Sequence, residues 1–289
     1  MRNRVLVTGA GGFVGRYLVT ALEGEGYEVV RHSLQDGDIS RCHLPYDGVT
    51  YVFHLAARTF VPDSWQITRE FYETNVLGAV NVLEFCRQHK CPLAIMSSYV
   101  YGRPRHLPIG EDHPLEAFNP YAHTKILAEE AARFYAEQFG FAVAVVRPFN
   151  LYGVGQSHHF LIPTLVHQAL APGDTITVAD TRPKRDYLHV RDLVALLLLI
   201  AKHRATGVYN AGSGISTSIA ELVEFINQSA PVRKKLVSAS RVRENEVLDT
   251  VADCSKAAAQ FGWTPRTVMA EGIRELVQDA ASSLQAGRS

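Results

Sequence analysis

The stretch Val5-Leu6-Val7-Thr8-Gly9-Ala10-Gly11-Gly12-Phe13-Val14-Gly15 decides the expected fold of this chain. Apolar and β-branched residues predict a short strand, and glycines at the spacing GxxGxxG lead from it into an apolar helical pattern that runs to Gly24. Gly9 would permit the tight turn, Gly12 would let backbone amides approach a pyrophosphate, and Gly15 would let the helix lie close to the sheet. The stretch therefore predicts a dinucleotide site on a strand-to-helix turn.

The alternation of strand and helix continues through the first half of the chain. Short β-branched runs predict strands, and between them apolar residues recur at spacings of three and four, as in amphipathic helices. We expect strands at 4–8, 28–31, 51–55, 93–97 and 142–147, and helices at 13–24, 68–89 and 121–139. This pattern is typical of an α/β fold with a Rossmann-type, doubly wound parallel sheet.

The pattern becomes less regular after Pro148. Prolines interrupt several short segments before a long apolar helix is expected at 190–202. We expect a dinucleotide-binding domain of residues 1–152 together with about 186–210. A smaller, interleaved carboxy-terminal substrate region would then comprise about 153–185 and 211–289.

The composition is that of an ordinary globular protein. Lys and Arg balance Asp and Glu at 29 each, which excludes a bulk field that would attract nucleic acid or a membrane surface. The longest apolar run, Leu193 to Ala201, is less than half of the roughly 20 residues that span a bilayer. The amino terminus shows no basic and apolar regions of a signal peptide, so we expect a cytoplasmic protein.

The cysteines and histidines do not form a metal-binding pattern. Cys42, Cys86, Cys91 and Cys254 lack CxxC spacing, so we expect them to be reduced thiols. The pair His158-His159 has no second ligand pair at helical spacing. We therefore expect no metal in the catalytic site.

The end of the second expected strand bears on the choice of cofactor. It reads Arg31-His32-Ser33, without the carboxylate that commonly binds the ribose hydroxyls of NAD. Ser33 with Arg31 and Arg16 leaves room and positive charge for a 2′-phosphate, so we expect NADP to be preferred, with NAD as the alternative. In that alternative both arginines are solvated surface groups.

Tyr121 and Lys125 form a candidate catalytic pair. They stand four residues apart in a helix whose start is marked by Asn119-Pro120, so they share one face. A phenol has a pKa of about 10 in water, and a neighbouring ammonium favours its ionised form, which makes Tyr121 a usable acid or base. The preceding strand ends in Met96-Ser97-Ser98-Tyr99-Val100-Tyr101-Gly102, which delivers hydroxyl groups to the edge of the sheet where ligands bind.

Further motifs occur in the order of one known family. They are His54-Leu55-Ala56-Ala57, Asn75-Val76-Leu77-Gly78, Ser97 to Gly102, Asn119-Pro120-Tyr121, Arg147-Pro148-Phe149-Asn150-Leu151-Tyr152-Gly153 and Arg185-Asp186-Tyr187-Leu188-His189-Val190. With the GxxGxxG turn they make nearly the whole chain resemble the extended short-chain dehydrogenase/reductases, NAD(P)-dependent epimerases, dehydratases and reductases of nucleotide sugars. The resemblance implies an enzyme whose substrate is a nucleotide-diphosphate sugar.

The resemblance also implies roles for individual residues. Tyr121 exchanges the proton at a sugar oxygen and Ser97 hydrogen-bonds to the same oxygen, while Lys125 binds the nicotinamide ribose and tunes Tyr121. The implied cofactor site consists of Gly9, Gly12, Phe13, Val14, Arg16, Ser33, Asp38, Ile39, Leu55, Ala56, Ala57, Asn75, Tyr121, Lys125 and Pro148. The implied substrate contacts are Ser98, Tyr99, Asn150, Phe160, Arg185 and Arg243.

Some of these residues have simpler readings. Arg185 and Arg243 would grip the diphosphate, although either alone could be a surface ion pair. Asn75 would support the site rather than react. His54 is expected to be a near-core histidine rather than a catalyst.

Two departures from the family pattern narrow the reaction. Where the 4,6-dehydratases carry Asp-Glu or Glu after the catalytic hydroxyl, this chain has Ser98-Tyr99, which leaves no candidate for the second acid/base that loss of water requires. Phe160 stands where galactose epimerases carry a substrate-binding Asn. We therefore expect hydride transfer at C4, by a 4-keto-6-deoxy-hexose reductase in preference to an NAD-dependent 4-epimerase.

A non-catalytic NADP-sensing regulator is the remote alternative, because such relatives lack the catalytic tyrosine that is present here. The expected helices at 68–89 and 121–139 resemble those that form a four-helix dimer interface in the family. A homodimer is the corresponding expectation.

Overall fold

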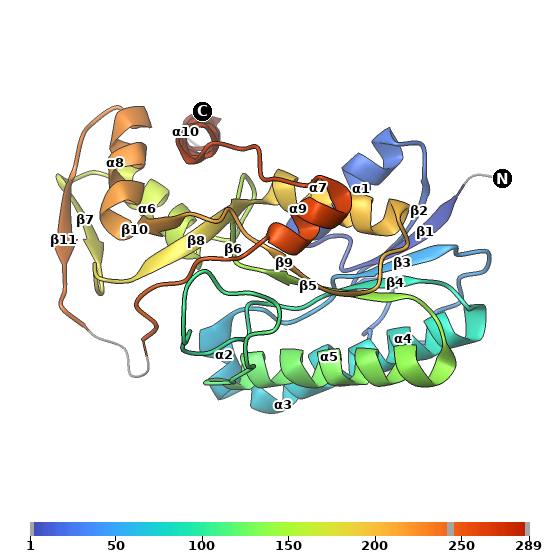
Figure 1. Ribbon diagram of the computed structural model, residues 1–289. Helices are drawn as coiled ribbons and strands as arrows, with labels where there is room; N and C mark the ends of the chain where they lie inside the picture. The colour runs from blue at the N-terminus through green and yellow to red at the C-terminus, as the bar shows by residue number, and fades with distance from the viewer. Residues whose placement is uncertain (1–2, 242–245, 287–289) are drawn as a thin grey trace.

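The structure is a computed structural model that describes residues 3–241 and 246–286. Its centre is a six-stranded sheet in the order β2-β1-β3-β4-β5-β9, in which every neighbouring pair is parallel (Figure 1). The strands are β1 (Arg4–Thr8), β2 (Glu28–His32), β3 (Tyr51–His54), β4 (Leu93–Met96), β5 (Val143–Pro148) and β9 (Gly207–Ala211). The order reverses between β1 and β3, which is where doubly wound sheets bind ligands.

Helices cover both faces of this sheet (Figure 1). One face carries α1 (Phe13–Gly24), α7 (Val190–Lys202) and α9 (Ser255–Phe261), and the other carries α2 (Val61–Gln66), α3 (Thr68–Tyr72), α4 (Gly78–His89) and α5 (Pro120–Phe139). Each layer has its own apolar core, with Leu18, Leu193 and Trp263 in the first and Leu83 and Ala132 in the second. The expected doubly wound α/β fold is confirmed.

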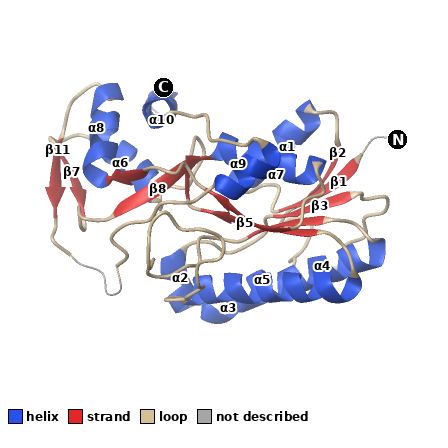
Figure 2. Ribbon diagram, in the orientation of Figure 1, coloured by secondary structure: helices blue, strands red, loops and turns tan. Residues whose placement is uncertain are grey.

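A smaller region is attached beyond the carboxyl ends of the strands (Figure 2). It contains a three-stranded sheet, β10-β8-β6, a two-stranded sheet, β11-β7, and three helices. Its elements are β6 (Asn150–Tyr152), α6 (Leu161–Leu170), β7 (Thr175–Val178), β8 (Lys184–His189), β10 (Ser216–Ser218), α8 (Ile219–Ser229), β11 (Lys235–Ser238) and α10 (Met269–Ala286). The three helices and both sheets share a core that includes Ile162, Leu222 and Ile273.

The expected helix at 68–89 is interrupted. Residues Glu73–Leu77 form a π-helical turn, η1, between α3 and α4. The turn contains Asn75, whose side chain bonds to the backbone of Arg58 and to Thr124, so a local change of helical winding aims one amide at two neighbouring segments. The predicted domain boundaries stay a prediction, and the packing of Ala257 and Trp263 on the main sheet argues for assigning α9 to the first unit.

None of the helices within the described residues combines the length and the apolar character needed to cross a membrane. Within those same ranges, no group of three or more His, Cys, Asp and Glu side chains could hold a metal ion. The four cysteines are free thiols, and Cys86 and Cys91 are buried next to each other at the end of α4.

Candidate active site

The glycine-rich turn has the shape that a phosphate group needs. Gly9 has a φ of +71°, and a Cβ atom there would lie 2.7 Å from the backbone nitrogen of Ala56. A Cβ at Gly15 would lie 2.2 Å from the carbonyl oxygen of Gly9. Gly12, an exposed N-cap, offers no side chain to the first N–H groups of α1, so these donors are left for an anion. The turn therefore fits the pyrophosphate of a dinucleotide.

The arginines expected beside the adenosine ribose already have partners. Arg31 forms an ion pair with Glu23 at 2.6 Å, and the Arg16 guanidinium donates to the carbonyl oxygen of Gly155. Ser33 lies next to the glycine turn, and both its backbone N–H and its hydroxyl donate to Asp36, at 2.8 and 2.9 Å. These hydrogen bonds lower the pKa of Asp36. A carboxylate that the sequence did not predict therefore lies beside Ser33, at the expected adenosine end of the site.

The remaining expected cofactor contacts surround the switch point of the sheet. Phe13 and Val14 form the first turn of α1, the half-buried run 55–57 follows β3, and Pro148 ends β5. Asp38 accepts hydrogen bonds from the backbone and hydroxyl of Ser40, which lower its pKa. Ile39 is buried in the core, where its side chain packs against Gly78. Ile39 can therefore offer a ligand little more than its backbone.

Helix α5 presents the predicted catalytic pair. Asn119 caps the helix by accepting from the backbone N–H of Ala122 at 2.8 Å, and Pro120 follows at the first helical position. Burial raises the pKa of Tyr121 to about 12, opposed by a hydrogen bond with the Ser98 side chain. The phenol is therefore neutral near pH 7, contrary to the expectation that a nearby ammonium would favour its ionised form.

Lys125 follows Tyr121 by about one turn of α5. Burial lowers its pKa to about 8, although the carboxylate of Glu129 raises it, and its ammonium donates to the carbonyl oxygen of Met96 at 2.9 Å. A lysine this close to its titration point still carries a proton for much of the time at neutral pH. It can stabilise a charge that forms on Tyr121.

A buried ion pair lies beneath these residues. Glu129 and Arg147 are joined at 2.6 Å, and their side chains are 8% and 5% exposed. The hydroxyl of Ser97 donates to the same Glu129 carboxylate. The structure thus brings Ser97 to the buried ion pair.

Asn75 and His54 have supporting positions. The buried Asn75 amide bonds to the backbone of Arg58, in the segment after β3, and to Thr124 of α5, and its supporting role stays a prediction. The His54 ring bonds to the hydroxyl of Thr8 at 2.8 Å, and burial lowers its pKa to about 3. His54 is therefore a neutral core histidine.

The expected substrate contacts lie on the side toward the smaller region. Asn150 donates to the carbonyl oxygen of Asp186 and accepts from the Tyr99 hydroxyl at 3.3 Å. Phe160, the N-cap of α6, packs edge-on against Phe60. The remaining two expected contacts are arginines, of which only one is described.

Arg185 is paired with Glu246, and both side chains are largely buried. Arg243 lies outside the described residues. A diphosphate that binds Arg185 would have to compete with the Glu246 carboxylate.

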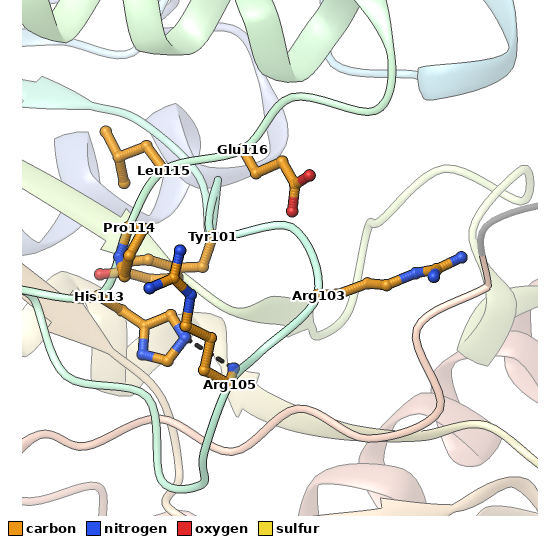
Figure 3. A pocket seen from close by; sticks show the side chains of 7 residues that line it. All are labelled: Tyr101, Arg103, Arg105, His113, Pro114, Leu115 and Glu116. Atoms are coloured by element: carbon orange, nitrogen blue, oxygen red, sulfur yellow. Dashed lines mark hydrogen bonds between the residues drawn. The ribbon is translucent and has the colours of Figure 1, made fainter.

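A hollow of about 260 Å³ opens within the loop after β4. Figure 3 shows that its lining comes from residues 101–116, with the His113 ring accepting a hydrogen bond from the backbone N–H of Arg105 at 2.9 Å. Arg103 points away from these two side chains (Figure 3). None of the residues predicted to bind cofactor or substrate lines this hollow.

Comparison with known proteins identifies the family of this chain. Residues 5–212, which include the glycine turn and the catalytic pair, match the NAD dependent epimerase/dehydratase family. The chain belongs to this family.

Curated members of the epimerase/dehydratase family resemble the chain over its whole length. A GDP-6-deoxy-D-mannose reductase of Pseudomonas aeruginosa is 29% identical over 99% of both chains. A putative UDP-glucose 4-epimerase of Methanocaldococcus jannaschii is 29% identical over 94% of this chain and 97% of its own. Relatives of equal similarity thus carry the names of different activities.

Two solved structures have the same fold. MoeE5 in complex with UDP-glucuronic acid and NAD superposes with a TM-score of 0.89 at 30% identity, covering 97% of this chain and 99% of its own. RMD from Pseudomonas aeruginosa, complexed with NADPH, gives a TM-score of 0.89 at 28% identity with the same coverage. MoeE5 thus holds a nucleotide sugar together with NAD, and RMD holds NADPH.

Proposed function

We propose that this member of the epimerase/dehydratase family is an NAD(P)-dependent reductase of a nucleotide-diphosphate 4-keto-6-deoxy-hexose, with Tyr121 as the proton donor. The observation that carries the proposal is the half-buried phenol of Tyr121, which is neutral near pH 7 and stands one helical turn before Lys125. Reduction of a ketone requires an acid that keeps its proton until the oxygen gains charge, and a phenol with a pKa of about 12 meets this requirement.

The chain's own groups divide the work of the reduction. A bound nicotinamide supplies the hydride. Tyr121 donates its proton to the oxygen at C4 as the carbon–oxygen double bond becomes single, and the resulting phenolate regains a proton from solvent. The Lys125 ammonium stabilises that phenolate until it is reprotonated.

The surroundings of Tyr121 argue against loss of water. The positions after Ser97 hold Ser98 and Tyr99, which cannot serve as a carboxylate acid/base. Glu129 is a nearby carboxylate, but Arg147 and Ser97 hold it in a buried network. Removal of a proton at a neighbouring carbon therefore has no obvious base among these groups.

A 4-epimerase is the second candidate. It is favoured by relatives such as the UDP-glucose 4-epimerase of Corynebacterium glutamicum, and by Asp36, which suits a tightly held NAD. Phe160 opposes it, because galactose epimerases resemble this chain but carry a substrate-binding Asn at that position. The presence of both Tyr121 and Lys125 argues against a non-catalytic regulator.

The geometry around Ser33 changes our expectation for the cofactor. The predicted NADP preference rested on Arg16 and Arg31 being available, and both have other partners. The Asp36 carboxylate could accept from the ribose hydroxyls of NADH, whereas it would repel a 2′-phosphate. We therefore propose that NADH binds more tightly than NADPH, which binding constants for the two would test.

The reaction can be tested with a panel of nucleotide sugars and their 4-keto-6-deoxy derivatives. Cofactor oxidation in step with product formation, followed at 340 nm, supports a reductase. Isomerised product without net cofactor change would instead establish the epimerase. Tyr121→Phe is the control, and an unimpaired rate in that variant would refute the mechanism.

We also propose a homodimer formed through α4 and α5. The large apolar side chains of Phe134 and Phe139 on α5 and of Leu77 just before α4 are 54%, 47% and 53% exposed. Phe134 and Phe139 contact each other, and exposed apolar side chains that gather on one helix favour a protein contact there. Light scattering should give twice the chain mass, and Phe134→Asp should halve it.

A further inference from the structure

We propose that Arg16 and Tyr17 are positioning residues that hold the loop of residues 153–160 against helix α1 and so fix the substrate side of the active site. This assignment replaces the expected role of Arg16 as a ligand of the cofactor. It rests on the proposed nucleotide-sugar chemistry for its kinetic part only, because the docking of the loop can be tested without a substrate.

The contacts with the loop come from one face of α1. The Arg16 guanidinium donates to the carbonyl oxygen of Gly155 at 3.0 Å. The Tyr17 hydroxyl donates to the carbonyl oxygen of Val154 at 2.9 Å, and its ring packs edge-on against Phe13 at 5.9 Å between centroids. Residues three and four apart are neighbours on a helix, so these three side chains form one surface. It adjoins the first N–H groups of α1, which are left for an anion.

Two glycines let the loop approach this surface. A Cβ atom at Gly153 would lie 2.6 Å from the Val190 side chain and 3.4 Å from the ring of Phe13. Gly155 has a φ of +81°, and a Cβ atom there would lie 3.0 Å from a guanidinium nitrogen of Arg16. A side chain at Gly153 would push the loop away from α1 and α7, and the left-handed backbone at Gly155 favours glycine.

The loop joins two of the expected substrate contacts. It begins after β6, which contains Asn150, and it ends at Phe160, the N-cap of α6. Within it, the backbone N–H groups of Gln156 and Phe160 donate to the carbonyl oxygens of Gly153 and Ser157, at 3.3 and 3.1 Å. Such local turns shape a loop without fixing its place on the protein. The two hydrogen bonds to α1 supply that placement.

The helix end that is expected to bind the pyrophosphate therefore also holds the loop that leads to the substrate contacts. If the loop is released, Phe160 can move relative to the cofactor, whereas Tyr121 and Lys125 stay in place on α5. Losing the two hydrogen bonds should then weaken binding of the nucleotide sugar and leave the hydride and proton transfers almost unchanged.

Hydrogen exchange of the free protein, measured on peptides that cover 153–160, tests the docking. Arg16→Met and Tyr17→Phe each remove a hydrogen bond but keep most of the side chain, so the Gln156 and Phe160 amides should exchange about fivefold faster. Arg16→Lys can still donate and should restore most of the protection. Thr20→Val is the matched control, because the Thr20 hydroxyl bonds to a carbonyl oxygen within α1. Wild-type exchange rates in both Arg16→Met and Tyr17→Phe would overturn the docking.

Binding and kinetics test the consequence of the docking. The double variant Arg16→Met/Tyr17→Phe should keep the wild-type ratio of affinities for NADH and NADPH. With the nucleotide sugar that the enzyme turns over, its KM should rise roughly tenfold and its kcat should stay within about twofold.

Two results would overturn the positioning role. A selective loss of NADPH affinity in Arg16→Met would make Arg16 a ligand of the 2′-phosphate, and a loss of kcat at an unchanged KM would place the two residues in the chemical step. Faster exchange with a raised KM, in an enzyme that isomerises its nucleotide sugar without net cofactor change, would uphold the inference and refute the reductase.

Discussion

Replacing Glu129 by glutamine should destabilise the protein strongly. The substitution keeps the shape of the side chain but leaves the charge of Arg147 buried without its partner, in a pair whose side chains are 8% and 5% exposed. Breaking a buried ion pair on one side costs about 3–5 kcal/mol. For a domain of this size, that corresponds to a melting temperature lower by on the order of 10 °C.

The same helix supplies a matched control. Glu137 also pairs with an arginine, Arg133, but the two side chains are 54% and 66% exposed. Glu137→Gln should therefore cost only about 0.3–0.5 kcal/mol. Urea denaturation followed by tryptophan fluorescence gives the free energy of unfolding of both variants under one set of conditions.

The two variants share the substitution, the helix and an arginine as partner, and they differ in the burial of the ion pair and in the additional hydrogen bond from Ser97 to Glu129. Equal losses in the two variants would mean that the environment of Glu129 is not the dry one seen in the structure. A stabilised Glu129→Gln variant would refute the reasoning altogether.

Three further predictions follow from single residues. Gly15→Ala should abolish binding of NADH in a fluorescence titration, because the new Cβ would clash with the turn, whereas Gly24→Ala, where nothing lies within 4 Å, should bind normally. Burial holds the pKa of Lys125 near 8, below its unfolded value of about 10.5, so the unfolded state binds more protons between these values. The free energy of unfolding should therefore rise over this pH range by an amount that is missing in Lys125→Met. Asp36→Asn should increase the affinity for NADPH relative to NADH, and an unchanged ratio of binding constants would contradict the proposed role of this carboxylate.

Much of the main sheet could be predicted from the sequence, because its strands and helices are long enough to show a clear period. Apolar spacing predicts α1 and α7 with their observed bounds and β1 with both its ends. The short strands β6 and β10 give no such signal, since three residues cannot display an alternation. The π-helical turn at Glu73–Leu77 does not interrupt the helical spacing of apolar residues, so the sequence predicts one continuous helix there.

The predicted site residues divide in the same way. The glycine turn and the pair Tyr121 and Lys125 are fixed by local geometry, which sequence spacing reports directly. The hydrogen bond from Ser97 to Glu129 joins the end of β4 to α5, so it depends on the packing of distant segments and spacing alone does not predict it. Asp36 was missed because it stands three residues beyond Ser33 and reaches back through hydrogen bonds.

Glu129 carries a signal that sequence reasoning could have used. It follows Lys125 by four residues, as Lys125 follows Tyr121, so the three side chains lie along one face of α5. The carboxylate raises the pKa of Lys125 against the effect of burial. Glu129→Gln should therefore move the loss of activity at alkaline pH to lower pH, because Lys125 would give up its proton earlier. An unshifted pH profile in a destabilised variant would mean that the buried ion pair stabilises the fold without tuning the catalytic pair.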